Sequence, residues 1–229
     1  MPANDNELGI LILAGGGSQR MGMDKALLPF EGRTFIECLV AQCCRGSSHV
    51  VISVGQDRQQ ALRKRFESTP LFSGVTWVAD QHNAKGPLAG IEAGLRALEP
   101  VCRYAFVTGC DVPVLKLELT AELLKIAKQQ NSRAVTPVDG QRTFGMTAVY
   151  RTDSWRAANE LIQQHSLRVS NLAAKLCATK VELADLRDID SELVSFLNIN
   201  HPKAYQDFLI SQGYDVDSDL IEKLSNSAK

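Results

Sequence analysis

The stretch Gly9–Leu28, GILILAGGGSQRMGMDKALL, decides how this chain is interpreted. Its apolar run Ile10–Leu13 has the length of a buried strand and is far too short to span a membrane. The three glycines Gly15–Gly17 follow, and the cations Arg20 and Lys25 lie close behind them. Glycine permits sharp turns that expose backbone N–H groups, and such turns bind anions when cations lie nearby. A phosphate chain is therefore the simplest ligand to expect here.

Two common phosphate-binding motifs do not fit this stretch. The dinucleotide fingerprint G-x-G-x-x-G, counted from Gly15, requires a third glycine where Arg20 stands. The P-loop pattern, counted from Gly17 and Gly22, has Met23 in place of its lysine. The remaining pattern is L-A-G-G-x-S-x-R-M-G-x-D-K, and its simpler alternative is a glycine-rich turn with cations in solvent.

Length, charge and cysteine spacing exclude several classes of protein. A chain of 229 residues can bury a substantial core, and a net charge of −1 offers no basic face for nucleic acid. The polar start MPANDNE is not typical of a secretory signal, and no apolar run approaches membrane length. The six cysteines lack C-x-x-C spacing, which argues against a zinc site or a disulfide framework. We expect a cytoplasmic protein that binds neither nucleic acid nor membrane.

Hydrophobic periodicity predicts alternating strands and helices along most of the chain. The alternation indicates an α/β, three-layer, Rossmann-like fold, with helices on both faces of a mostly parallel sheet. The turn Asp139-Gly140 predicts a hairpin and therefore an antiparallel element. We expect one domain over residues 1–229, with a core of about 8–209 and a tail, 213–229, that docks as a helix or stays disordered. The expected strands after the first are His49–Val54, Val75–Ala79, Tyr104–Gly109, Arg133–Val138, Thr143–Tyr150 and Lys180–Leu183; the main expected helices are 32–45, 57–66, 87–98, 155–162, 169–176 and one starting at Pro202.

An acidic residue follows the strand Tyr104–Gly109 in the run Cys110-Asp111-Val112-Pro113. A carboxylate at the carboxyl end of a buried strand points into the crevice where α/β sheets bind ligands. Magnesium prefers hard oxygen ligands and commonly takes one or two carboxylates besides phosphate oxygens and water. Asp111 suits that role, and the alternative is that it caps the helix expected near Leu115–Thr120.

Two further stretches could approach a ligand. In Gly86–Gly90, GPLAG, proline suits the first helical position, and the small residues allow close contact with the sheet or with a ligand. Asn198 and Asn200 alternate, so both amides face one side if that segment is extended. The alternative for the second stretch is that Asn200 or His201 caps the helix starting at Pro202.

The pattern from Leu13 to Lys25 resembles the signature loop of the sugar-phosphate and cofactor nucleotidyltransferases. It is most similar to that of the molybdenum cofactor guanylyltransferases (MobA-like), whose G-P-L-A-G, C-D-x-P and N-x-N-T-P motifs also have counterparts here. His201 stands where the family usually has threonine, and the hairpin Arg142–Met146 lacks the family's proline and leucine. The resemblance covers most of residues 8–209 and implies a nucleotidyltransferase fold of the GT-A type.

The resemblance also implies an activity: transfer of GMP from GTP to molybdopterin, giving molybdopterin guanine dinucleotide and pyrophosphate, with Mg²⁺ as cofactor. It implies that Lys25, assisted by Arg20, stabilises charge on the triphosphate and that Asp111 holds the metal. The implied partners are GTP and molybdopterin, together with other molybdenum cofactor biosynthesis proteins and acceptor molybdoenzymes. The nucleotide-binding residues expected on this basis are Leu13, Ala14, Gly15, Gly16, Gly17, Lys25, Ser53, Asp80, Asp111, Asn198 and Asn200.

Three other functions remain open at this point. A CTP-dependent molybdopterin cytidylyltransferase is one, although cytidylyl relatives tend to carry alanine where this chain has Gly15. A sugar-phosphate nucleotidyltransferase is another, although those enzymes are usually longer. The third is a nucleotide-binding module without catalysis.

Overall fold

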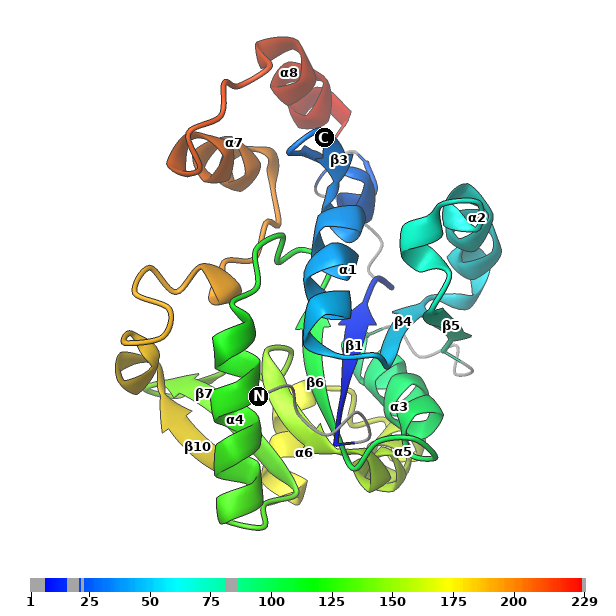
Figure 1. Ribbon diagram of the computed structural model, residues 1–229, viewed down its shortest axis with the longest axis vertical. Coiled ribbons are helices and arrows are strands. Elements are labelled where there is room, and N and C mark those ends of the chain that lie inside the picture. The colour runs from blue at the N-terminus through cyan, green and yellow to red at the C-terminus, as the bar shows by residue number, and fades with distance from the viewer. Residues whose placement is uncertain (1–6, 16–20, 22, 81–85, 228–229) are drawn as a thin grey trace.

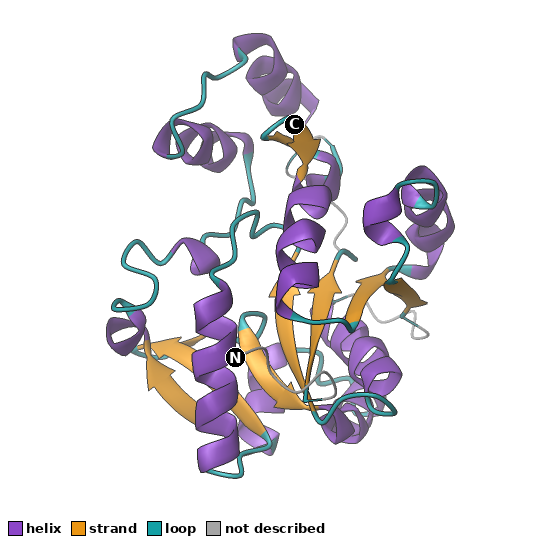
Figure 2. Cartoon of the chain, viewed as in Figure 1, coloured by secondary structure: helices purple, strands orange, loops and turns teal. Residues whose placement is uncertain are grey.

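The computed structural model describes residues 7–15, 21, 23–80 and 86–227. Helices cover both faces of a central sheet, which confirms the expected α/β class (Figure 1). Figure 2 shows the same layers, with orange strands lying between purple helices.

In the described part of the chain, the main sheet has eight strands in the order β10-β7-β9-β6-β1-β4-β5, with β8 paired to β7. β1 lies in the middle and pairs in parallel with β4 and β6, and the pairs β4–β5 and β7–β10 are parallel too. β9 runs antiparallel to both β6 and β7, so the expected antiparallel element is confirmed. The strand bounds are β1 Leu8–Leu13, β4 Val50–Val54, β5 Val75–Ala79, β6 Tyr104–Gly109, β7 Ala134–Asp139, β8 Arg142–Thr143, β9 Ala148–Arg151 and β10 Thr179–Glu182, and a separate hairpin joins β2 Pro29–Phe30 to β3 Arg33–Thr34.

As far as β7, helices alternate with the strands of the main sheet as expected; after β9, helices α5 and α6 follow one another, as do α7 and α8 after β10. None of the described helices is both long and apolar enough to cross a lipid bilayer. Their bounds are α1 Phe35–Gly46, α2 Gln56–Phe66, α3 Pro87–Leu98, α4 Leu117–Gln129, α5 Trp155–Gln163, α6 Val169–Lys175, α7 Pro202–Ser211 and α8 Ser218–Ser227.

Two local expectations are corrected by the structure. The helix expected over residues 32–45 begins only at Phe35, because the β2–β3 hairpin precedes it and Thr34 starts a capping box. There the Glu37 carboxylate accepts hydrogen bonds from the backbone N and the Oγ1 of Thr34, at 2.9 and 2.6 Å. The strand expected over Thr143–Tyr150 is split into β8 and β9, because its pairing with β7 is interrupted between Thr143 and Ala148; β9 then pairs with β7 on one side and with β6 on the other.

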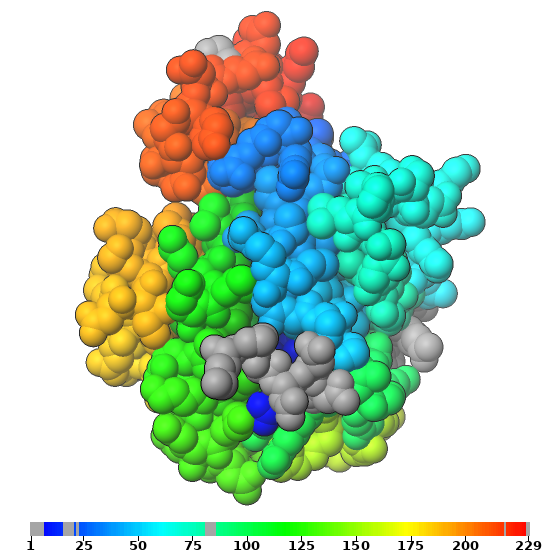
Figure 3. Space-filling view, viewed as in Figure 1, coloured from blue at the N-terminus to red at the C-terminus, as the bar shows by residue number. Residues whose placement is uncertain are grey.

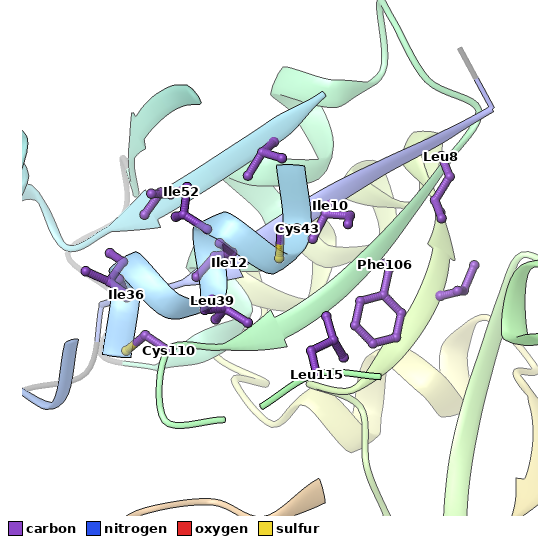
Figure 4. Packing of buried hydrophobic residues seen from close by; sticks show 14 of the residues in the cluster. Leu8, Ile10, Ile12, Ile36, Leu39, Cys43, Ile52, Phe106, Cys110 and Leu115 are labelled. Carbon is purple, nitrogen blue, oxygen red and sulfur yellow. The ribbon is translucent and has the colours of Figure 1, made fainter. Parts of the chain in front are cut away.

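Alternating side chains of the central strands build a hydrophobic core on each face of the sheet. Ile10 and Ile12 of β1 face α1, α2 and α4, whereas Leu11 and Leu13 face α3, α5 and α6. Figure 4 shows the first core, in which Leu39 of α1 lies over these strands. Every residue of β1 is buried, as is every residue of its neighbours β4 and β6, so the strand that leads into the glycine loop lies in the enclosed centre of the sheet.

The small residues of α3 serve contact with the sheet. A Cβ atom on Gly94 would lie 2.2 Å from Cδ1 of Leu11, and one on Gly90 would lie 3.1 Å from Cδ2 of Leu13. Both distances are too short for a side chain without displacement, so α3 needs glycine to pack closely on β1. Of the two alternatives for the Gly86–Gly90 stretch, contact with the sheet or with a ligand, contact with the sheet therefore applies at least to Gly90.

A third hydrophobic cluster lies beyond the sheet and joins the C-terminal helices to the segment around Lys25. α7 and α8 contribute Phe208 and Leu224, which pack with Met21, Leu28 and Phe30. Figure 3 shows these helices, in orange and red, seated on the blue N-terminal segment. The apolar stripe of the tail is thus used to cover residues that flank the glycine loop.

We predict that Leu224→Ala loosens this cluster, because Leu224 is only 2% exposed. Truncating a buried leucine to alanine costs about 2–5 kcal/mol. Limited proteolysis should therefore cleave the variant before α8 much faster than the wild type, and the unfolding temperature should fall. Glu222→Ala, an exposed position on the same helix, is the matched control. Equal cleavage rates in all three proteins would show that α8 does not depend on this contact.

Candidate active site

Residues expected at the site lie at neighbouring strand ends along one edge of the sheet. Leu13 of β1 is in register with Ser53 of β4 on one side and with Gly109 of β6 on the other. The backbone N of Ala14 donates to Ser53 O at 2.8 Å, and that of Cys110 donates to Leu13 O at 3.0 Å. These bonds bring the loops after the strands together at the edge where α/β sheets bind ligands.

The ammonium group of Lys25 meets Asp111 and Asn200, although these residues are far apart in sequence. Its Nζ lies 3.8 Å from Oδ2 of Asp111 and donates a hydrogen bond to Oδ1 of Asn200. The side chains of Lys25 and Asp111 are 19% and 17% exposed, so the pair is mostly enclosed but open to solvent on one side. A cation, a carboxylate and an amide oxygen thus converge near the ends of β1 and β6, where the glycine loop starts.

Burial changes the electrostatics of the Asp111 carboxyl. Loss of solvent raises its pKa above the usual value, while the positive charge of Lys25 and a backbone hydrogen bond oppose the rise. The alternative of a helix cap is wrong, because α4 begins at Leu117 with Lys116 in the N-cap position. The Asp111 side chain is therefore not occupied in ending a helix and faces Lys25.

Gly109 provides the space that the Asp111 carboxylate occupies. A Cβ atom on Gly109 would lie 2.4 Å from Oδ1 of Asp111, a separation that no real Cβ contact tolerates. Any side chain at this position would push the carboxylate away from its place beside Lys25. In the sequence Gly109 is recognisable only as the end of a strand, and no local signal indicates this role.

The segment Asn198–His201 is held against the strand end by its backbone. The N of Ile199 donates to Asp111 O at 2.9 Å, and the Ile199 side chain is buried in the third cluster. His201 Nδ1 accepts from the backbone N of Ala204 at 3.1 Å, so the histidine caps α7 where the family usually has threonine. Asn200 is thereby left to contact Lys25, and Asn198 lies half-buried two residues before it.

Ser53 and Asp80 lie farther along the same edge, toward β5. Ser53 is 2% exposed, and its Oγ has no hydrogen-bond partner among the described residues. Gly90 is its close neighbour, because a Cβ atom there would lie 3.1 Å from that oxygen. Asp80 is half-buried and lines a hollow of about 660 Å³ together with Trp77 and residues of α2 and α3.

The glycine loop is only partly described. Gly15 is exposed, and a Cβ atom there would lie 3.4 Å from the backbone N of Gly55, at the start of α2. Gly16, Gly17 and Arg20 lie outside the described residues, so the structure does not place them.

The structure also reveals two residues that sequence reasoning did not select. Asp24 caps the short 3-10 helix Lys25–Leu27, since its Oδ1 accepts from the N of Ala26 at 3.1 Å. Its other oxygen, Oδ2, accepts from Nη2 of Arg58 on α2. The Asp24-Lys25 dipeptide was quoted as part of the loop pattern, but nothing local in the sequence pairs it with Arg58.

The donor set suits a hard cation with few protein ligands. The described residues contain no group of three or more His, Cys, Asp or Glu side chains able to hold a metal. Asp111 and the amide oxygen of Asn200 both lie beside Lys25, which gives two oxygen donors of the type that Mg²⁺ takes. An ion bound there would depend on phosphate oxygens and water for its remaining ligands.

We predict that Asp111→Asn raises the unfolding temperature at neutral pH. Since burial raises the pKa of Asp111 in the folded protein, the folded state binds this proton more tightly than the unfolded chain does. The ionised carboxylate therefore costs stability above its folded pKa, and that cost disappears as the pH falls below the unfolded value near 4. The advantage of the variant should shrink in thermal unfolding as the pH is lowered. A variant less stable at neutral pH would mean that the ion pair with Lys25 outweighs burial.

Known proteins resemble this chain in sequence and in fold. The model of the MobA-like NTP transferase domain family matches residues 10–177. A Mycobacterium tuberculosis protein named "Probable molybdenum cofactor guanylyltransferase" is 34% identical over 181 residues, covering 78% of this chain and 85% of the relative. A Methanosarcina acetivorans protein of the same name is 31% identical over 205 residues, covering 87% and 88%.

A solved structure shares the whole fold. Molybdopterin-guanine dinucleotide biosynthesis protein A from Archaeoglobus fulgidus superposes with a TM-score of 0.76 at 24% identity, covering 89% of this chain and 99% of that one. The family match spans most of the chain and includes Lys25 and Asp111. The chain therefore belongs to the MobA-like NTP transferase family and is a nucleotidyltransferase.

Proposed function

We propose that this protein transfers GMP from GTP to molybdopterin, forming molybdopterin guanine dinucleotide and releasing pyrophosphate. The relatives named as guanylyltransferases support this reaction. The observation that carries the proposal is the meeting of Lys25, Asp111 and Asn200 beside the glycine loop. Such a site offers a cation for phosphates together with oxygen donors for a divalent metal.

The triphosphate is proposed to lie over the end of β1. Lys25 would neutralise its charge, and the backbone of Ala14 and Gly15 would lie along it. By resemblance, Gly16, Gly17 and Arg20 would add further donors. The Asn200 amide oxygen holds the lysine ammonium in position through its hydrogen bond, which limits the freedom of a long side chain.

Magnesium is the proposed metal, and Asp111 and Asn200 would hold it. When bound, the ion supplies charge neutralisation on phosphate oxygens. Asp111 must be ionised to bind it, and Lys25 favours that form against the effect of burial. Metal binding should therefore weaken on acidification at a higher pH than an ordinary aspartate would predict.

The nucleoside is proposed to lie beside β4 and β5. Asp80 would accept hydrogen bonds from the N1–H and exocyclic amine of guanine or from ribose hydroxyls. The buried Ser53 hydroxyl faces the start of α3 and would be satisfied by the same ligand. Leu13 would line the base pocket from the end of β1.

The chemical step requires no nucleophile from the protein. A terminal phosphate oxygen of molybdopterin attacks the α-phosphorus of GTP, and the bond to the bridging oxygen breaks so that pyrophosphate leaves. Catalysis of this kind depends on in-line positioning and charge stabilisation. Cys110 next to the site is not a rival nucleophile, because burial, with Asp111, raises the pKa of its thiol to about 12.

The test is incubation of the protein with Mg²⁺, molybdopterin and each NTP in turn, followed by assay of pyrophosphate and of the dinucleotide product. We expect turnover with GTP and little with CTP. Asp111→Asn should lower kcat by about 10²–10³-fold, as expected for loss of one charge-stabilising group. Asp188→Asn, which is exposed on a distant loop, is the control. Preference for CTP would make the enzyme a cytidylyltransferase, and nucleotide binding without product would leave only a binding module.

Gly109→Ala tests the placement of the carboxylate with the Asp111 side chain itself unchanged. The added methyl would displace Asp111 Oδ1, and misplacement by about 1 Å can cost ~10²-fold in rate. We expect kcat/KM for GTP to fall by about 10–100-fold while circular dichroism stays native. In the control Gly74→Ala, the new Cβ would meet nothing within 4 Å, so activity should be retained. Full activity of Gly109→Ala would contradict the role given to this glycine.

A further inference from the structure

Arg58 lies at a place in α2 that helix stability does not explain. It is in the first turn of the helix, which Leu62 and Phe66 anchor in the core. The N-terminus of a helix carries partial positive charge, so a cation in the first turn is unfavourable. The position of Arg58 is therefore accounted for by a contact outside its own helix.

That contact is the carboxylate of Asp24, which joins α2 to the turn that carries Lys25. Asp24 Oδ2 accepts from Arg58 Nη2, while its Oδ1 accepts from the N of Ala26 at 3.1 Å. The backbone O of Asp24 also accepts from the N of Leu27 at 2.9 Å. Asp24 thus defines the short helix that begins with Lys25, and α2 holds Asp24 through Arg58.

The pair is too enclosed to be an ordinary surface ion pair. The side chains of Arg58 and Asp24 are only 29% and 21% exposed. Burial and the charge of Asp111 raise the pKa of the Cys110 thiol, whereas the positive charges of Lys25 and Arg58 lower it. The charge of Arg58 therefore acts at the end of β6, where Cys110 lies. Arg58 therefore acts on the same small region as Lys25.

The negative charge of Asp24 is unfavourable beside a phosphate-binding cation, and Arg58 neutralises it. Asp24 directly precedes the cation that is proposed to receive the triphosphate. An uncompensated carboxylate at this point would repel a polyanion and attract the lysine ammonium. A carboxylate paired with Arg58 keeps its capping bond to Ala26 without that penalty.

We propose that Arg58 is a positioning residue of the nucleotide site: it neutralises Asp24, so that Asp24 can orient Lys25 without repelling the triphosphate. The inference rests on the proposed function, since it assumes a triphosphate beside Lys25. Arg58 acts through Asp24, and its guanidinium stays on that carboxylate when the nucleotide is bound.

The test compares Arg58→Gln with the double variant Asp24→Asn/Arg58→Gln. Calorimetric titration with Mg·GTP, in the absence of molybdopterin, gives Kd without turnover. Arg58→Gln should raise Kd about 10-fold, because it leaves Asp24 charged beside the polyanion. The double variant should return to within about 3-fold of the wild type, because asparagine keeps the cap on Ala26 and removes the charge. Arg58→Lys, which keeps the charge, should lose less than about 3-fold.

Two controls separate this role from a structural one. Arg63→Gln removes an exposed arginine from the same helix and should bind Mg·GTP as the wild type does. Thermal unfolding of each variant shows whether the fold is intact. A merely structural ion pair would leave the double variant no better than Arg58→Gln, whereas the proposed role requires recovery.

Two results would overturn the inference. One is wild-type affinity in Arg58→Gln. The other is a double variant that binds as weakly as Arg58→Gln or more weakly: with a lowered unfolding temperature this would mean a structural ion pair, and with an unchanged one it would mean that Arg58 contacts the phosphates itself. Failure of the proposed function looks different, because the wild type itself would then neither bind Mg·GTP nor release pyrophosphate.

Discussion

The pairing of Lys25 with Asp111 is the constraint on which the site depends. Each charge alone would be unfavourable in a mostly enclosed crevice, and burial already raises the pKa of Asp111. Together they stabilise each other at 3.8 Å while keeping one side open to solvent. The proposed ligand, a polyanion carrying a divalent cation, would match both members at once, because phosphate would replace the carboxylate beside the lysine and the metal would replace the lysine beside the carboxylate. On binding, Lys25 and Asp111 would each exchange one oppositely charged neighbour for another, so neither charge would be desolvated without a partner.

The sheet supplies the precision that such an exchange needs. β1 is buried along its whole length, and its last residue, Leu13, is in register with Ser53 and Gly109 on the neighbouring strands. The backbone hydrogen bonds that continue beyond these ends fix where the loops start. Close packing of α3 through Gly94 holds β1 from the other side. Of the residues proposed to meet the ligand, Leu13, Ser53 and Asp111 are therefore placed by the ends of paired strands.

Sequence alone predicted the fold well where the periodicity was strong and the partners were local. The apolar run before the glycine loop and the regular alternation that follows it indicated a parallel sheet, and the position of Asp111 after β6 indicated its edge. Three features had no local signal. The insertion of β9 between β7 and β6 depends on pairing with a strand far away in sequence. The space above Gly109 depends on the rotamer of Asp111, and the contact between Arg58 and Asp24 depends on how α2 packs. Gly16, Gly17 and Arg20, which the glycine-rich turn with its nearby cations indicated and the family resemblance supported, lie outside the described residues and remain predictions.

The C-terminal segment shows why the site cannot be reduced to the range that matches the family model. That range ends at residue 177, but Asn200 contacts Lys25 from beyond it. The backbone bond from Ile199 to Asp111 places this segment against β6, and the Ile199 side chain enters the cluster that also buries Met21 and Leu28. Since Met21 and Leu28 flank Lys25 in sequence, one apolar cluster holds both the lysine turn and its asparagine partner. The helices that complete this cluster, α7 and α8, thus help to fix the position of a charged group through the apolar residues on both sides of it in sequence.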